Sequence, residues 1–506
     1  MIMTKEIISA KSTELQSYVD QLTNLVGEAV EERTPLHHVE EKTLRILLEM
    51  GRTTLQILFD VLGPGDVGET AQLPEGRTVR RLEDTHSREY VSVFGEFQLD
   101  RYVYGRGQGR KIEMIPLDAR LAMPESKFSY LLQDWDQSLT MEQPFEKVSS
   151  AVHKILGLNQ HVDSLERMNR HMSETVESFH MHQTAPPLKE EGPILVQTAD
   201  GKGVPIRRAA DAPSIESHQS KSGPKPGAKR MATLGAVYSI APHVRSPQEI
   251  VQSLFRHPSE PRTKSNRSRP QHKRVRASLD HTDPCGDDIH GAAAVFGWMS
   301  GEVAARNPNH DKPVVSIMDG QESLWNLRDV FQQDVPMIDI LDLLHVTPRL
   351  WEAAHLFYSP GSKMAENFVR QRVLRVLKGE VSSVIIGLRR LAATHKLREK
   401  KLQKIQTITN YFANNQDRMR YHEYLAAGYP IASGVIEGAC RHVVKDRLER
   451  TGMTWTVPGA QAMLSLRCVH LSGLWDEFTK FRVQSETARL YPYRSKLAEM
   501  QWTLAT

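Results

Sequence analysis

The stretch "PVVSIMDGQESLWNLRDVFQQDVPMIDILDLLHV", residues 313–346, holds two short apolar runs separated by an amphipathic segment. The runs "PVVSIMD" and "MIDILDLLHV" are typical of buried strands, whereas "SLWNLRDVF" has its apolar residues at helical spacing. Upstream lie three more strand-like runs, "ILVQTAD", "GVPIRR" and "MATLGAVYSIA", and a helix-rich stretch near 286–306. Three strands, a helix and two further strands, with helices on the connections, predict a mixed α/β sheet.

Length and charge set limits on the class of protein. A chain of 506 residues predicts three or four structural units. Its 65 Lys and Arg against 61 Asp and Glu give a net charge of only +4, so a nucleic-acid partner has to be argued from where the charge lies. Cys285, Cys440 and Cys468 lack metal-ligand spacing, which fits a reducing compartment. With no apolar N-terminal segment, we expect a cytoplasmic protein without a membrane partner.

Residues before the sheet are mainly helical. Residues 10–62 have apolar positions at helical spacing, and "EYVSVFGEFQLDRYVY" (89–104) has the pattern of a strand pair. Gly157 and "LNQHVD" then separate two amphipathic segments, with Asp163 or Ser164 placed to cap the second. This predicts a helix-turn-helix in which "SLERMNRHMSETV" enters a DNA major groove. An ordinary helical hairpin is an equally good interpretation of this pattern.

Two polar inserts interrupt the sheet region, "RRAADAPSIESHQSKSGPKPGAKR" (207–230) and "RHPSEPRTKSNRSRPQHKRVRAS" (256–278). Both are basic and nearly free of large apolar residues, so we expect mobile loops that fold against a polyanion, with Lys273, Arg274 and Arg276 contacting DNA. Solvated surface loops are the alternative. The expected domains are N-terminal helices with a β-hairpin (1–120), a helix-turn-helix-like region (121–182), the α/β core (193–346), a helical insertion (347–426), the last core helix (427–470) and a helical tail (471–506).

Three carboxylates lie where a site can form. Asp200 ends the strand "ILVQTAD", Asp319 ends the strand "PVVSIMD", and Glu437 lies in the first turns of the helix that follows the helical insertion. Reactive residues lie at strand ends, and a helix alongside can add one more. Such a cluster suits phosphodiester chemistry with two Mg²⁺ or Mn²⁺ ions, because hard cations need oxygen ligands. The alternative is that Asp200 and Asp319, each followed by glycine, belong to turns.

The segment around Glu437, "GYPIASGVIEGACRHVVKDRLERTGMTW" (428–455), combines apolar and basic residues. A carboxylate beside an apolar helix face is costly unless a cation or partner satisfies it. Basic side chains follow on the same helix and are expected to hold DNA phosphates: Arg441, Lys445, Arg447 and Arg450. A surface Glu–Arg pair explains Glu437 and Arg441 without explaining the apolar segment before them.

Two further features have alternative explanations. Asp342 and His345 share a face if the chain turns helical after the last strand, either as supporting residues of the site or as a buried structural pair. Trp455 can stack on an unpaired base, or belong to the core.

These motifs resemble a known family. "TADGKGVPIRR", "KRMATLGAVYSIAP", "IMDGQESLW", "ILDLLHV" and above all "RMRYHEYLAAGYPIASGVIEGACRHVVKDRLERTGMTW" are similar to the ISKra-type insertion-sequence transposases of the DDE class, over roughly residues 80–495. The resemblance implies a ribonuclease-H-like core interrupted by a helical insertion, with Asp200, Asp319 and Glu437 as the metal-binding triad. Asp342 and His345 are then supporting residues.

The function implied is that of a bacterial, nucleoid-associated transposase. It binds the terminal inverted repeats of its own element as double-stranded DNA and cleaves there with metal-activated water. The freed 3′-hydroxyl then attacks target DNA. Two ends have to meet, so at least a homodimer is expected on DNA. The alternatives are a DNA-binding protein without catalysis and a ribonuclease-H-like nuclease that cuts without joining.

Overall fold

The computed structural model describes residues 2–107, 109–207, 229–256, 268–283, 285–450, 452–500 and 502. The chain divides into two compact units. Unit 1 comprises Met1–His171 and Asp476–Thr506, and unit 2 comprises Met172–Trp475. Within the described ranges, no helix is both long enough and apolar enough to cross a membrane.

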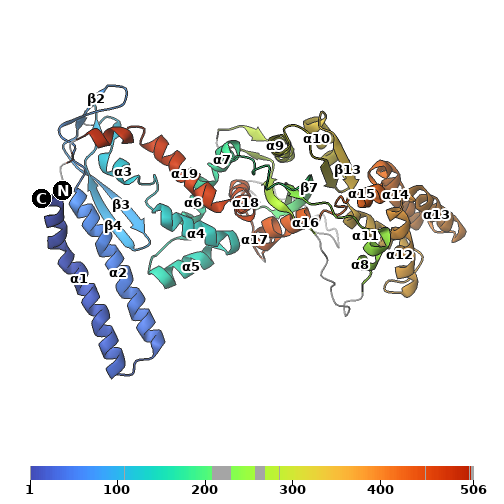
Figure 1. The fold of residues 1–506 in the computed structure, drawn as a ribbon, viewed down its shortest axis with the longest axis horizontal. Helices are drawn as coiled ribbons and strands as arrows, with labels where there is room; N and C mark the ends of the chain where they lie inside the picture. Colours follow the sequence, from blue (N-terminus) through green and yellow to red (C-terminus); the bar gives the residue numbers. More distant parts are fainter. Residues whose placement is uncertain are drawn as a thin grey trace, which may run out of the picture. The chain divides into compact units, whose positions relative to one another are not determined.

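Unit 1 opens with a helical hairpin, α1 (Ile2–Glu31) and α2 (Leu36–Leu62), whose helices lie side by side (Figure 1). The predicted strand pair is β3 (His86–Ser92) and β4 (Gly95–Arg101), which are antiparallel. Phe97 and Leu99 of β4 pack on Phe59 of α2. The other strands form a small sheet in the order β1 (Thr70–Gln72), β2 (Thr78–Arg81), β5 (Tyr104–Gly105) and β6 (Ile112–Met114).

Four helices follow in the chain: α3 (Pro116–Leu121), α4 (Tyr130–Glu142), α5 (Phe145–Leu156) and α6 (Val162–Ser173). The last two are the two amphipathic segments expected on either side of Gly157, which ends α5 in the left-handed region with φ 75°. The capping prediction is wrong, because α6 begins at Val162, ahead of Asp163 and Ser164. The second helix is also shorter than predicted, since α7 (Val176–His182) begins separately.

The C-terminal segment is an integral part of unit 1. After α19 (Trp475–Leu490), Tyr491 and Tyr493 are buried against the small sheet. The Tyr491 hydroxyl donates to the Met123 carbonyl at 2.8 Å, and the Tyr493 hydroxyl accepts from the Ile115 amide at 2.9 Å. The expected tail therefore docks on residues far away in the sequence.

Unit 2 is built on a five-stranded mixed sheet, ordered β13 (Met337–Leu341), β12 (Val314–Met318), β7 (Ile194–Pro205), β8 (Lys229–Ile240) and β9 (Gln271–Ser278). β7, β8 and β9 pair antiparallel, whereas β12 pairs in parallel with both β7 and β13. The predicted mixed α/β sheet is confirmed. The predicted strand "GVPIRR" is not a separate element, since its first residues continue β7.

The strand β9 comes from a segment that was predicted from the sequence to be a mobile loop. β9 spans residues 271–278, and its Val275 and Ala277 are buried. Both of its arginines are neutralised rather than solvated: Arg274 donates to Glu302 of α9 (Gly291–Arg306) at 2.9 Å, and Arg276 pairs with Glu177. Charge pairing thus lets a basic segment form a covered strand. Most of the two inserts, residues 208–228 and 257–267, lies outside the described residues.

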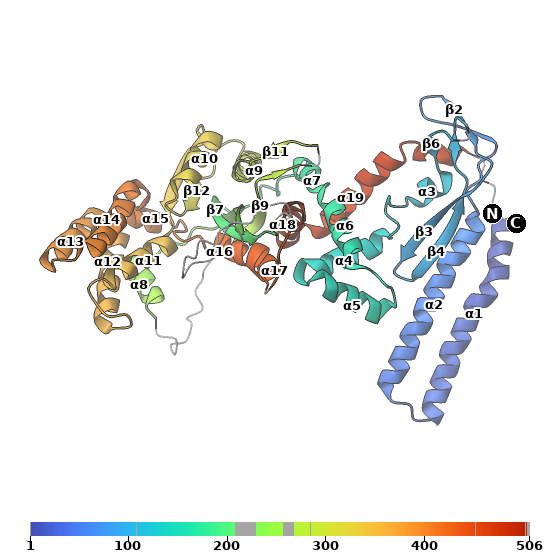
Figure 2. The same ribbon diagram turned by 180° about the vertical axis from the view of Figure 1, so that it is seen from behind.

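Helices cover both faces of this sheet. On one face, Leu195, Val237 and Met318 pack with α9 and with α10 (Glu322–Gln332). On the other, Val196, Val315 and Ile317 join a larger core with the helical insertion. That insertion has the predicted all-helical form and is grouped at one end of the unit (Figure 2). Its helices are α11 (Leu343–Ala354), α12 (Lys363–Leu377), α13 (Val381–Thr394), α14 (Glu399–Asn414) and α15 (Tyr421–Ala426).

Candidate functional site

Three acidic residues lie at one level across neighbouring strands of unit 2. Asp319 and Asp342 follow the last residues of β12 and β13, whereas Asp200 lies within β7, so the expectation that it ends its strand is wrong. Ala199 of β7 pairs with Met318 of β12, and Met318 pairs with Leu341 of β13. The residues that follow these three in the sequence are Asp200, Asp319 and Asp342. Adjacent strands are about 4.8 Å apart, so the register alone brings their backbones together. Asp200 also shares the strand face of Val196, which is the face toward the helical insertion.

The two Asp-Gly pairs, for which turns were the alternative interpretation, differ in local structure. Gly201 lies inside the twelve-residue strand β7, and neither Gly201 nor Gly320 has a positive φ. Gly320 serves close packing instead, because a Cβ there would lie 2.3 Å from a ring carbon of Tyr411. The alternative of a turn is therefore wrong for Asp200, whereas Asp319 does lie at a loop turn, in which its carboxylate accepts a hydrogen bond from the Gln321 amide.

Glu437 joins this group from a short helix, α16 (Gly434–Ala439), which packs on β7 and β8. One turn later, the Cys440 thiol donates to the Asp200 carboxylate at 3.5 Å. Cys440 therefore lies on the side of the helix that faces β7, whereas Glu437, one turn earlier, is exposed. Cys440 was missed as a site residue, although its spacing from Glu437 could have indicated it.

The apolar segment before Glu437 anchors α16 to the end of β13. Asp342 is fully buried and accepts hydrogen bonds from the amides of Leu344 at 2.9 Å and Ser433 at 3.2 Å. The Ser433 hydroxyl donates to the same carboxylate, and the His345 imidazole approaches it at 3.1 Å. Asp342 thus caps α11 and holds the segment that carries Glu437. Asp342 is therefore a buried structural residue, which was one of its two interpretations, and it lies directly beside Asp319, at the end of the neighbouring strand.

Burial and like charge both act on these carboxyl groups. Burial raises the pKa of Asp200, and the negative charge of Asp319 raises it further, against the Gly201 amide, the Cys440 thiol and the charge of His345. The pKa of Glu437 is raised in the same way, by burial and then by the charges of Asp342 and Asp200. His345 responds in the opposite sense: its hydrogen bond to Asp342, with the charge of the acidic group, raises its pKa. The group thus has excess negative charge, which a cation would relieve.

The donor set fits a hard divalent cation in its chemistry. Asp200, Asp319 and Glu437 offer carboxylate oxygens, which Mg²⁺ and Mn²⁺ prefer. Their oxygens are not all within 4.8 Å of one another, as a closed ligand shell would require. These three residues could hold a cation after side-chain adjustment.

The basic residues expected to bind DNA divide into two sets. Arg441 and Lys445 are exposed, whereas Arg450 and Lys273 are half-buried. Arg447 and Arg274 are buried, so the expectation that they contact DNA phosphates is wrong. The Arg447 guanidinium stacks 5.0 Å from the ring centre of Trp455, which is also buried as a core residue. Arg276 is paired with Glu177.

A helical irregularity changes the spacing of these residues. Cys440–Lys445 forms a π-helix between α16 and α17 (Asp446–Leu448). Its wider turn breaks the four-residue spacing expected after Glu437, and Arg441 approaches Asp446 instead, at 3.6 Å. Such π-helical turns occur often at functional sites.

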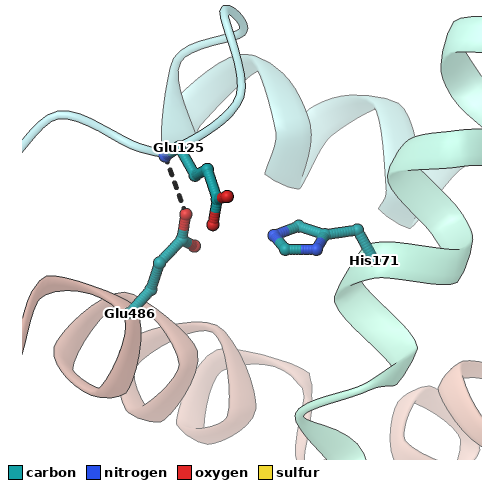
Figure 3. A group of neighbouring side chains, drawn as sticks. All are labelled: Glu125, His171 and Glu486. Carbon is teal, nitrogen blue, oxygen red and sulfur yellow. Dashed lines mark hydrogen bonds between the residues drawn. The ribbon is translucent and has the colours of Figure 1, made fainter. Parts of the chain in front are cut away.

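Unit 1 holds another set of possible metal ligands, Glu125, His171 and Glu486 (Figure 3), whose ligand atoms lie within 4.8 Å of one another. The Glu125 amide donates to Glu486 at 2.9 Å. Arg489 donates to Glu125 at 2.5 Å and Arg482 to Glu486 at 3.3 Å. Two arginines thus already balance the two carboxylates, so the cluster is explained as an ion-pair network that fastens α19 to unit 1.

Comparison with models of known protein families gives no match, and no curated protein is similar enough to count as a relative.

Proposed function

We propose that this protein is a DDE-type DNA transposase that cleaves at the ends of its own mobile element and joins them to target DNA. The observation that carries the proposal is the strand register, which puts Asp200 and Asp319 at one level on adjacent strands with Glu437 on the helix beside them. An acidic group of this kind is suited to metal-assisted phosphodiester chemistry.

The fold and the sequence motifs support the same proposal. A sheet of three antiparallel strands followed by two parallel ones is the arrangement expected of a ribonuclease-H-like core. The helical insertion lies between the second and third acidic residues, as the resemblance to ISKra-type transposases implies. The α5–α6 pair is the candidate for recognition of the terminal inverted repeats. Its outer face carries the exposed Arg167 and Arg170.

In this mechanism Asp200, Asp319 and Glu437 would hold two Mg²⁺ or Mn²⁺ ions. Bound there, the metal supplies an activated nucleophile and stabilises charge on the attacking and leaving oxygens. Asp342 and Ser433 keep Glu437 in place, and His345 adds positive charge beside the reacting phosphate. Arg441 and Lys445 hold the DNA backbone. Bringing two element ends together requires at least a dimer on DNA.

The test is strand cleavage and joining on DNA that carries the segments flanking the coding sequence, with Mg²⁺ or Mn²⁺. We expect the wild-type chain to cut and join, and Glu437→Gln to bind this DNA but do neither. Cutting without joining would favour a ribonuclease-H-like nuclease. Binding without cutting by the wild-type chain would favour a DNA-binding protein without catalysis. Equal activity of the variant would show that Glu437 is structural.

A further inference from the structure

The helical insertion reaches the acidic group through one aromatic side chain. Tyr411 of α14 is half-buried and packs on Gly320, the residue that follows Asp319. A Cβ at Gly320 would lie 2.9 Å from the Tyr411 hydroxyl oxygen, so that hydroxyl is close to the backbone of the acidic strand end. Burial, and then the charge of Asp319, raises the pKa of Tyr411 to about 12. The phenol is therefore a neutral hydrogen-bond donor at physiological pH.

An arginine accompanies this tyrosine. Arg349 lies on α11 one turn after His345, on the same helix face. Its guanidinium is 5.2 Å from the ring centre of Tyr411, and 39 % of its side chain is exposed. Its carboxylate contact is weak: Glu352 lies 3.4 Å away and is bound more closely by Lys404, at 2.8 Å. Arg349 therefore keeps donors available beside the acidic group.

The acidic group creates an electrostatic problem for a nucleic-acid substrate. Asp200, Asp319 and Glu437 would repel the phosphates of a DNA strand wherever cations do not fully neutralise them. An arginine solves this problem well, since its guanidinium stays charged and forms paired hydrogen bonds with phosphate oxygens. Stacking on Tyr411 limits the freedom of the guanidinium, which lowers the entropic cost of such a contact.

We propose that Arg349, held by Tyr411, positions the substrate by binding a DNA phosphate next to the one that reacts at Asp319. The helical insertion would then form one wall of the site. This inference rests on the proposed function and assigns to it two residues that the sequence motifs do not contain.

The test compares variants of the full chain in the cleavage assay. Arg349→Gln keeps length and a planar end group but loses the charge, and Arg349→Lys restores the charge. Arg390→Ala is the matched control, an exposed arginine on α13 of the same insertion. Because Arg349→Gln loses one charge-assisted phosphate contact, we expect its kcat/KM to fall about tenfold or more. Arg349→Lys should recover part of this loss, and Arg390→Ala should match wild type.

Salt dependence supplies a readout that a purely structural role would not change. The slope of log KM against log salt should fall by roughly 0.9 in Arg349→Gln, the value for one phosphate contact. Equal activity and equal slope in Arg349→Gln and wild type would overturn the role of Arg349 while leaving the proposed function intact. A wild-type chain that cleaves no DNA would overturn both.

Discussion

A buried acid in unit 1 allows a quantitative prediction for pH. Asp136 of α4 is fully buried. One carboxylate oxygen accepts from the Gln160 amide at 2.8 Å, and the other has no hydrogen-bond partner among the described residues. Burial raises the pKa of Asp136 to about 7. Replacing it by asparagine keeps the size and the acceptor for Gln160 and removes the titration.

The sign of the effect follows from proton binding. Between the ordinary pKa of 3.8 and about 7, the folded chain keeps a proton on Asp136 that the unfolded chain has released. Stability from this group is therefore complete below the ordinary pKa and is lost as pH rises through the folded pKa. A shift of about three units at 1.36 kcal/mol each gives a loss of about 4 kcal/mol.

Urea unfolding of wild type and Asp136→Asn from pH 4 to 8 measures this loss, with hydrogen exchange in α4 used to isolate unit 1. The free energy of unfolding of Asp136→Asn, relative to wild type, should rise by about 4 kcal/mol across that range. Asp163→Asn, which changes an exposed carboxylate of α6, is the control and should show no such rise. Parallel pH profiles for wild type and Asp136→Asn would refute the reasoning.

Three more substitutions test the packing and charge of unit 2. Without metal, Glu437→Gln should have a higher melting temperature than wild type at neutral pH and lose this advantage in acid. The reason is that burial and the neighbouring carboxylates destabilise the ionised form of Glu437, which raises its pKa. Gly320→Ala should cost about 1–3 kcal/mol of unfolding free energy by overpacking against Tyr411, and Tyr411→Leu in the same chain should recover part of it. Arg306→Met should cost about 3–5 kcal/mol by leaving buried Glu191 unpaired, whereas replacing both should cost less. Thermal melting checks the first, and urea unfolding checks the other two.

The sequence correctly predicted a mixed sheet, but it did not identify all of the segments that form its strands. Apolar runs identified β7, β8, β12 and β13 because consecutive residues of each strand are buried, although in β13 only the last two are. The strand β9 was hidden because its arginines are typical of a solvated loop, and only the structure reveals their partners, Glu302 and Glu177.

The site was predictable where it depends on local pattern and not where it depends on contacts across the chain. Apolar strand patterns found Asp200 and Asp319, since the register of the parallel strands brings them to one level, although Asp200 lies within β7 and not at its end. No sequence pattern could indicate Tyr411, which reaches Gly320 from the helical insertion. The π-helix after α16 was equally invisible, because its segment has the composition of a regular helix.

We propose above that Asp200, Asp319 and Glu437 hold the divalent cations of a strand-cleaving site. Replacing Mg²⁺ by Fe²⁺, with ascorbate and peroxide, breaks the polypeptide beside the bound ion, and mass spectrometry locates the breaks. We expect breaks next to these three residues, and we expect excess Mg²⁺ to suppress them and Asp319→Asn to abolish them. Breaks confined to the surroundings of Glu125 and His171, or a pattern unchanged in Asp319→Asn, would contradict this proposal.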